Sequence, residues 1–214
     1  MSLVGVEQGV MRPTALVLNL FVATIVIVRF HRAGALPWRQ LVPLAAGSVP
    51  AAFVGGSIDL PGEIYRPLVA MVLLAGAWRL FTARSSEADE RTRPGVPWLP
   101  GLVAGAGIGL LAGLSGTGGG IFLTPMLVLA GWTRTRDAAG LSGAFILVNS
   151  ISGLGGLLLG DFSVPSSLPI WVAAVVAGGL IGSWLGAARF SILQLRRVLA
   201  AVLVVAAAKL VLFP

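Results

Sequence analysis

A run of small and hydroxyl-bearing residues interrupts an apolar stretch near the middle of the chain. It reads Gly113-Leu-Ser115-Gly116-Thr117-Gly118-Gly119-Gly120-Ile-Phe-Leu-Thr124-Pro125. Consecutive glycines permit backbone conformations forbidden to other residues, so a helix is not expected to persist through them. If a helix restarts near Gly120, its free N–H groups and positive dipole end would face the break, and Ser115 and Thr117 could add hydroxyl donors. The chemistry predicted is binding of a small anion, beside a restarted helix whose regularity Pro125 limits.

The same glycines allow a second interpretation, a tight turn between closely packed helices. Two series of glycines recur every four residues on one helical face: Gly101, Gly105, Gly109 and Gly113, and then Gly178, Gly182 and Gly186. Small residues at this spacing are typical of helix packing in membranes, so we interpret both series as structural. For residues 115 to 120 we favour substrate contact, with packing alone as the alternative.

Two asparagines lie inside apolar stretches, where a side-chain amide can hydrogen-bond across helices or to a substrate. They are Asn19 and Asn149, and we leave both roles open. The candidate substrate-binding residues are therefore Ser115, Gly116, Thr117, Gly118, Gly119, Gly120, Pro125, Asn19 and Asn149.

Catalysis, nucleotide binding and metal binding lack support in the sequence. The segment Gly116-Thr-Gly118-Gly-Gly-Ile121 lacks the last glycine of a dinucleotide fingerprint, and no Gly-Lys-Ser/Thr follows it. The chain has no cysteine, and its one histidine, His31, falls in a predicted loop. No Asp or Glu lies deep in a predicted span, which favours an anion or neutral solute over a cation. We expect no cofactor, no metal and no enzymatic activity.

Composition indicates that these residues sit inside a membrane protein. Of the 214 residues, 57% are hydrophobic and 11% charged, against about a quarter charged in soluble domains. The net charge of +7 does not indicate nucleic-acid binding, because the basic residues lie between apolar runs. We predict an all-α, polytopic transmembrane bundle forming a single membrane domain, 1–214, of about eight helical segments. They span residues 13 to 28, 41 to 58, 67 to 82, 97 to 115, 119 to 132, 138 to 159, 169 to 188 and 193 to 213.

The basic residues also predict an orientation, since cytoplasmic loops carry the positive excess. With eight crossings, all Lys and Arg except Arg12, Arg66 and Lys209 fall on one face, which puts both termini outside. The short segment 119 to 132 could instead be a half-helix, and if it does not cross, this assignment fails. We interpret Arg12 as an interfacial anchor, with attraction of an anion as the alternative.

The two halves resemble each other at a shift of about 130 residues. Asn19 and Asn149 are then in register, and 47–55 falls on 178–186. The shift carries each segment past an odd number of crossings, which predicts an inverted-topology repeat of the kind found in secondary transporters. Residues 1–82 form the first half, lacking its leading helix pair, 83–96 a cytoplasmic linker and 97–214 the second half. The missing pair would lie upstream of residue 1 in a longer protein, or be absent from a shortened form.

With these residues in place, the chain resembles the sulfite exporter TauE/SafE family of bacterial and plant membrane permeases over nearly its whole length. The resemblance rests on Gly116-Thr-Gly118-Gly119-Gly120 followed by Pro125 and Met126-Leu127, preceded by a helix ending Gly109-Leu-Leu-Ala-Gly113-Leu-Ser115. Ala139-Gly140-Leu-Ser142, Gly160-Asp161 and the 178–186 series support it. A similar glycine-rich motif, often present in the N-terminal half of family members, is missing here.

The resemblance implies secondary transport, without ATP, of small anions such as sulfite, sulfonates or related sulfur-containing or organic anions. It also implies a multi-pass protein of the bacterial inner membrane. The expected partners are a small anionic substrate and the lipid bilayer, with a homo-oligomer left open and nucleic acid not expected. The alternative function is a non-transporting or truncated membrane subunit that serves as an assembly partner.

Overall fold

The computed structural model describes residues 8–59, 61–82, 95–160 and 163–188, with isolated positions at 201, 204, 205 and 208. Within these ranges the chain is helical and contains no strand. The helices are α1 (Gln8–Arg32), α2 (Trp38–Ser57), α3 (Gly62–Thr82), α4 (Trp98–Ser115), α5 (Gly120–Leu129), α6 (Thr135–Leu157) and α7 (Leu168–Ala188). The predicted segment 193–213, apart from the isolated positions, and residues 83–94 of the predicted linker 83–96 lie outside the described residues.

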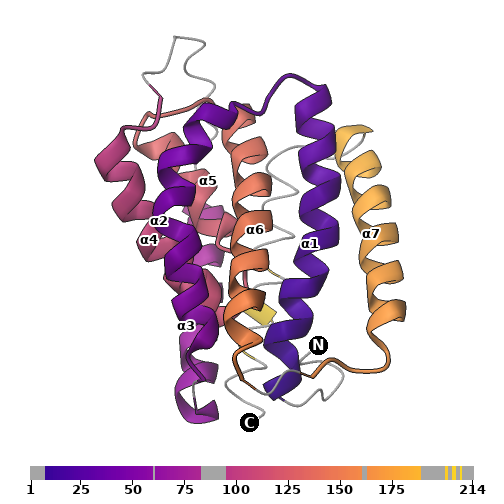
Figure 1. Cartoon of the computed structure of the whole chain (residues 1–214). Coiled ribbons are helices and arrows are strands. Elements are labelled where there is room, and N and C mark those ends of the chain that lie inside the picture. Colours follow the sequence, from indigo (N-terminus) through magenta and orange to yellow (C-terminus); the bar gives the residue numbers. More distant parts are fainter. Residues whose placement is uncertain are drawn as a thin grey trace.

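The helices form an upright bundle with α6 near its centre (Figure 1). Helices α2, α4 and α6 run in one direction, and α1 and α7 run in the other. Helices α1 and α6, equivalent in the predicted repeat, are thus antiparallel, as an inverted repeat requires. The repeat itself stays a prediction, because the predicted counterpart of α3 falls outside the described residues.

Three of the described helices are long and apolar enough to cross a membrane: Val10–Arg32, Trp98–Ser115 and Arg136–Leu157. Large apolar side chains face outward on the bundle, with Leu99 69% exposed and Ile170 71% exposed. Such a surface is stable against lipid and not against water, because lipid tails are as apolar as the side chains. The predicted helical membrane bundle is confirmed.

Glycine brings α2 and α4 into backbone contact. A Cβ added to Gly105, Gly109 or Gly113 would lie 2.2, 2.4 or 2.3 Å from the carbonyl oxygens of Leu44, Ser48 and Ala52, respectively. No side chain fits at such distances, so the first glycine series packs helices, as predicted. At Gly178, of the second series, an added Cβ would meet nothing within 4 Å among the described residues, so packing of that series stays a prediction. The surroundings of Gly182 and Gly186 lie outside the description.

Helix α5 is a half-helix. Its 10 residues span about 15 Å, half of a hydrocarbon layer of about 30 Å. The buried break precedes it: Gly116 lies against Arg12, whereas Gly119 lies against Ile108 and Ala112 of α4. Beyond α5, Leu127 and Trp132 pack with Leu36 and Leu41, at the end where α2 begins. The chain therefore returns to the end from which α4 started, and the membrane orientation stays a prediction.

The environment of Arg12 corrects our interpretation of it as an interfacial anchor. Arg12 is only 6% exposed. Its Nε donates to Gly113 O of α4 at 2.8 Å, and Nη1 and Nη2 donate to Ile58 O and Gly56 O at 2.8 Å each, with a further bond to Gly55 O. These carbonyls belong to the C-terminal ends of α2 and α4, where the helix dipole is negative. The guanidinium therefore joins two helix ends inside the bundle.

We predict that Gly109→Ala destabilises the protein by about 1–3 kcal/mol, because its methyl group would overlap the Ser48 backbone. Gly107→Ala is the matched control, since a Cβ there meets nothing within 4 Å in the part of the chain that the structure describes. Thermal unfolding in detergent should show a lower midpoint for Gly109→Ala and an equal or higher midpoint for Gly107→Ala. Equal midpoints for the two variants would contradict the backbone contact.

For Arg12→Gln we predict a loss of at least about 2 kcal/mol, because several buried carbonyls lose a charged donor. Arg12→Lys should recover part of this loss, since an ammonium keeps the charge but not the planar fork. Arg32→Gln, at the exposed end of the same helix, should change stability by less than about 0.5 kcal/mol. Chemical or thermal unfolding measures all three, and an Arg12→Gln variant as stable as Arg32→Gln would refute the role of Arg12.

Candidate functional site

The break between α4 and α5 depends on glycine for its backbone conformation. Gly116, Gly118 and Gly119 have φ values of 74°, 71° and 78°, in the left-handed region that other residues rarely adopt. A Cβ on Gly118 would lie 2.9 Å from Ile146 Cγ2 and 3.0 Å from Asn19 Nδ2. The break is therefore held closely between α1 and α6, and most of it is buried. Irregular backbone at membrane depth is stable only when protein surrounds it in this way.

The two hydroxyl groups of the break form a short chain of hydrogen bonds. Ser115 Oγ donates to Leu111 O at 2.6 Å and lies 2.9 Å from Thr117 Oγ1. Because the Ser115 proton goes to Leu111, the proton between the hydroxyls comes from Thr117. Both expected donors are thus engaged with the protein, and either must give up a bond before it can donate to a ligand.

Asn19 braces the break from α1. Its Nδ2 donates to Gly116 O at 3.2 Å, which satisfies a carbonyl that the end of α4 leaves without a helical partner. Of the two roles that the sequence left open for Asn19, the structure shows the hydrogen bond between helical segments.

Asn149 has no such bond, although it is fully buried on α6. Neither its amide nitrogen nor its oxygen has a hydrogen-bond partner within the described chain. One turn earlier on α6, Phe145 meets Gly119, and one turn later Gly153 meets Gly113. Since residues four apart share a helix face, Asn149 faces the stretch between these two glycines.

Two serines accompany this amide. The hydroxyls of Ser48 and Ser150 are fully buried and also lack partners among the described residues. Across the α1–α6 interface, Leu16 reaches Gly153 and Val26 reaches Gly143. In this antiparallel register Ser150 lies at the level of Asn19, whereas Ser48 lies against Gly109 of α4. The name polar layer is used below for Asn19, Ser48, Ser115, Thr117, Asn149 and Ser150.

Electrostatics distinguish the two helix ends at the break. The C-terminal end of α4 is neutralised by Arg12, which binds Gly113 O. The N-terminal end of α5 has no side-chain cap, and its N-cap residue is Gly119. Its free N–H groups and the positive end of its dipole therefore face the break, as the sequence predicts for an anion site.

The remaining candidate, Pro125, lies in the body of α5, more than one turn beyond the start of the helix. Nearby, Thr124 Oγ1 and Ser142 Oγ lie 2.6 Å apart and tie α5 to α6. The structure thus brings Asn19, Asn149 and residues 115–120 together, with Pro125 further along α5. Within the described ranges, no group of three or more His, Cys, Asp or Glu could hold a metal ion.

Sequence reasoning missed Ser48, Ser150 and the buried position of Arg12. Ser150 follows Asn149 directly, so a polar pair inside an apolar span was a usable signal. Ser48 carried no such signal, because one hydroxyl in a helix of small residues is ordinary.

Comparison with known proteins agrees with this architecture. The model of the family described as "Sulfite exporter TauE/SafE" matches residues 1–210. The chain is 35% identical over 214 residues to the "Probable membrane transporter protein y4hK" of Sinorhizobium fredii (strain NBRC 101917 / NGR234), covering 98% of this chain and 86% of the relative. No solved structure matches it significantly. The chain belongs to the sulfite exporter TauE/SafE family and is a membrane transporter, not an enzyme.

Proposed function

We propose that the protein is a secondary transporter of small anions in the bacterial inner membrane, and that the polar layer binds the anion in transit. The observation that carries this proposal is the buried amide of Asn149, which has no hydrogen-bond partner among the described residues and faces the break beside the uncapped start of α5. An unsatisfied buried polar group costs about 1–3 kcal/mol. An unsatisfied group of this kind in a native protein calls for a functional explanation, and here we propose that it forms hydrogen bonds with a substrate.

The charge of the site favours an anion. Positive potential comes from the N-terminal end of α5, and Asn149 Nδ2 and the hydroxyls of Ser48 and Ser150 supply donors. The described carboxylates lie elsewhere: Asp59 and Glu63 are exposed, and Asp137 is in the first turn of α6. A cation at the polar layer would therefore lack the carboxylate that cation sites usually contain.

Sulfite and sulfonates fit this arrangement by their chemistry. Each carries a compact group of oxygen acceptors, and a helix N-terminus together with amide and hydroxyl donors is a recurring way to bind such a group. The family name supports the same substrate class. The sequence contains no phosphate-binding loop for ATP, so we propose transport driven by gradients.

Flux measurements test the function directly. In proteoliposomes of the purified chain, we predict uptake or release of sulfite or an organosulfonate at least tenfold above empty vesicles. A cation such as choline should not be moved. No flux of any tested anion, in vesicles where the protein is folded and inserted, would favour the alternative of a membrane subunit that does not transport.

One substitution at Asn149 distinguishes a role of its amide in substrate binding from a role in stabilising the fold. We predict that Asn149→Leu lowers anion flux at least tenfold while raising thermal stability, because an apolar side chain of similar size removes an unsatisfied amide. Ser152→Ala is the matched control on the same helix. Its hydroxyl already donates to Val49 O at 2.5 Å, so its loss should cost about 1 kcal/mol and leave flux near normal. If Asn149→Leu is destabilised and still transports, the amide is structural and the site assignment is wrong.

A further inference from the structure

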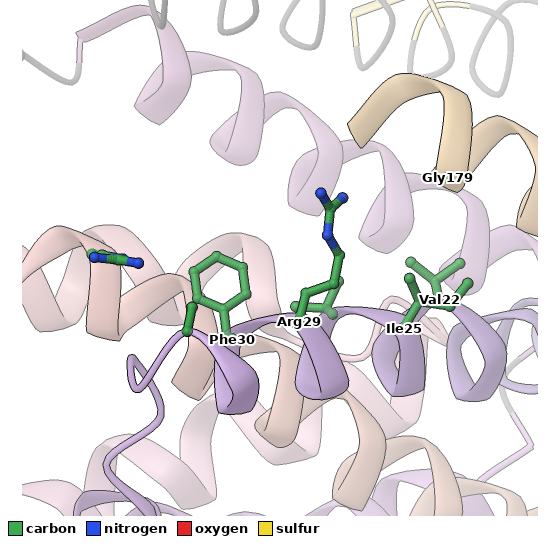
Figure 2. A pocket seen from close by; sticks show the side chains of 8 residues that line it. Val22, Ile25, Arg29, Phe30 and Gly179 are labelled. Atoms are coloured by element: carbon green, nitrogen blue, oxygen red, sulfur yellow. The ribbon is translucent and has the colours of Figure 1, made fainter. Parts of the chain in front are cut away.

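A cleft of about 390 Å³ lies between α1 and α7, away from the polar layer. Its walls include Val22, Ile25, Val26 and Phe30 of α1 and Gly179 of α7, and Arg29 and Arg136 also line it. Figure 2 shows the Arg29 side chain extending from α1 on the side that carries Val22 and Ile25, with Gly179 beyond. We propose that this cleft binds an anionic phospholipid, with an acyl chain along the apolar wall and the phosphate at the two guanidinium groups.

The charges lie where a lipid phosphate would meet them. Arg29 is in the last turn of α1 and Arg136 is at the start of α6. Both side chains are exposed, and neither forms an ion pair within the described part of the chain. Basic pockets between transmembrane helices, at the end where basic residues gather, are typical binding sites for anionic headgroups.

The walls of the cleft suit an anionic lipid better than a free inorganic anion. Beyond the two arginines, the lining side chains named above carry no hydrogen-bond donor, in contrast to the amide and hydroxyl groups of the polar layer. A small hydrated anion would lose water against these walls without compensation. A molecule with a long apolar tail and one anionic group satisfies both parts of the cleft.

The packing of α7 leaves room for such a molecule. Among the described helices α7 packs mainly on α1. Within the described ranges, a Cβ added to Gly178 or Gly179 would meet nothing within 4 Å. A lipid at this position would fill the space between α1 and α7, so it would hold the two helices together whatever the transported substrate is.

Lipid retention by the purified, full-length protein tests the proposal. Native mass spectrometry should show phosphatidylglycerol retained at least tenfold more than phosphatidylcholine. Binding should weaken about fivefold for each guanidinium removed, and therefore at least tenfold in the double variant Arg29→Gln/Arg136→Gln. Gly179→Leu should also release the lipid while keeping every charge, because its side chain grows into open space within the cleft.

Two matched variants act as controls. Arg32→Gln removes an equivalent charge at the same helix end without lining the cleft, and Gly178→Leu adds the same bulk one residue away. Both should retain phosphatidylglycerol as the unaltered protein does. The proposal is overturned if phosphatidylcholine binds equally well, if Arg32→Gln weakens binding as much as the double variant, or if Gly179→Leu keeps its lipid. It is also overturned if millimolar inorganic phosphate alone stabilises the protein against heat as much as phosphatidylglycerol, since the occupant would then be a free anion.

Discussion

The hydrogen bonds of Arg12 to the ends of α2 and α4 are the constraint on which the rest of the described bundle depends. An arginine buried in a membrane protein is expensive unless its charge and its donors are matched. Here backbone carbonyls supply the acceptors, and two helix C-termini supply the negative potential. Because one guanidinium holds both ends, α2 and α4 must finish at the same depth. That depth is where the break begins and where Ser115, Thr117 and Asn19 meet.

Much of this fold could be predicted from the sequence because membrane helices follow simple physical rules. A glycine every fourth residue in an apolar helix predicts a close approach, and Gly105, Gly109 and Gly113 make one. At Gly178 the same pattern meets no neighbour among the described residues, because spacing determines which residues share a helix face and does not determine what packs against that face. The partner of a glycine face, α2 for α4, comes from tertiary structure alone.

The candidate site could be predicted only in part, for a similar reason. Consecutive glycines indicate a break in a helix, and a side-chain amide among apolar residues needs a hydrogen-bond partner. Residues 115–120, Asn19 and Asn149 could therefore be identified as candidates from the sequence. Ser48 and Ser150 were not identified, because a helical hydroxyl usually bonds a carbonyl one turn earlier, as that of Ser115 does with Leu111. The hydroxyls of Ser48 and Ser150 instead lack partners among the described residues, an outcome of rotamer and neighbours that composition does not encode. Arg12 was misjudged because its position in the sequence, at the start of a span, is also where interfacial anchors occur.

The two helix ends at the break are close in sequence but differ in electrostatic potential. The potential therefore becomes more positive from the end of α4 to the start of α5. The end of α4 is neutralised by a fixed charge, so it contributes little to the potential of the polar layer. The start of α5 has neither a side-chain cap nor a neighbouring carboxylate among the described residues, so its positive end stays available. Under the proposed function, an anion entering the bundle would be drawn past Ser115 toward Gly119 and Gly120, which Asn149 faces. Thr124 and Ser142 hold α5 against α6, so the half-helix presents its N–H groups in a preorganised position. This polarity follows from where each helix ends, so the proposed preference for negative charge does not require an acidic or basic side chain in the polar layer.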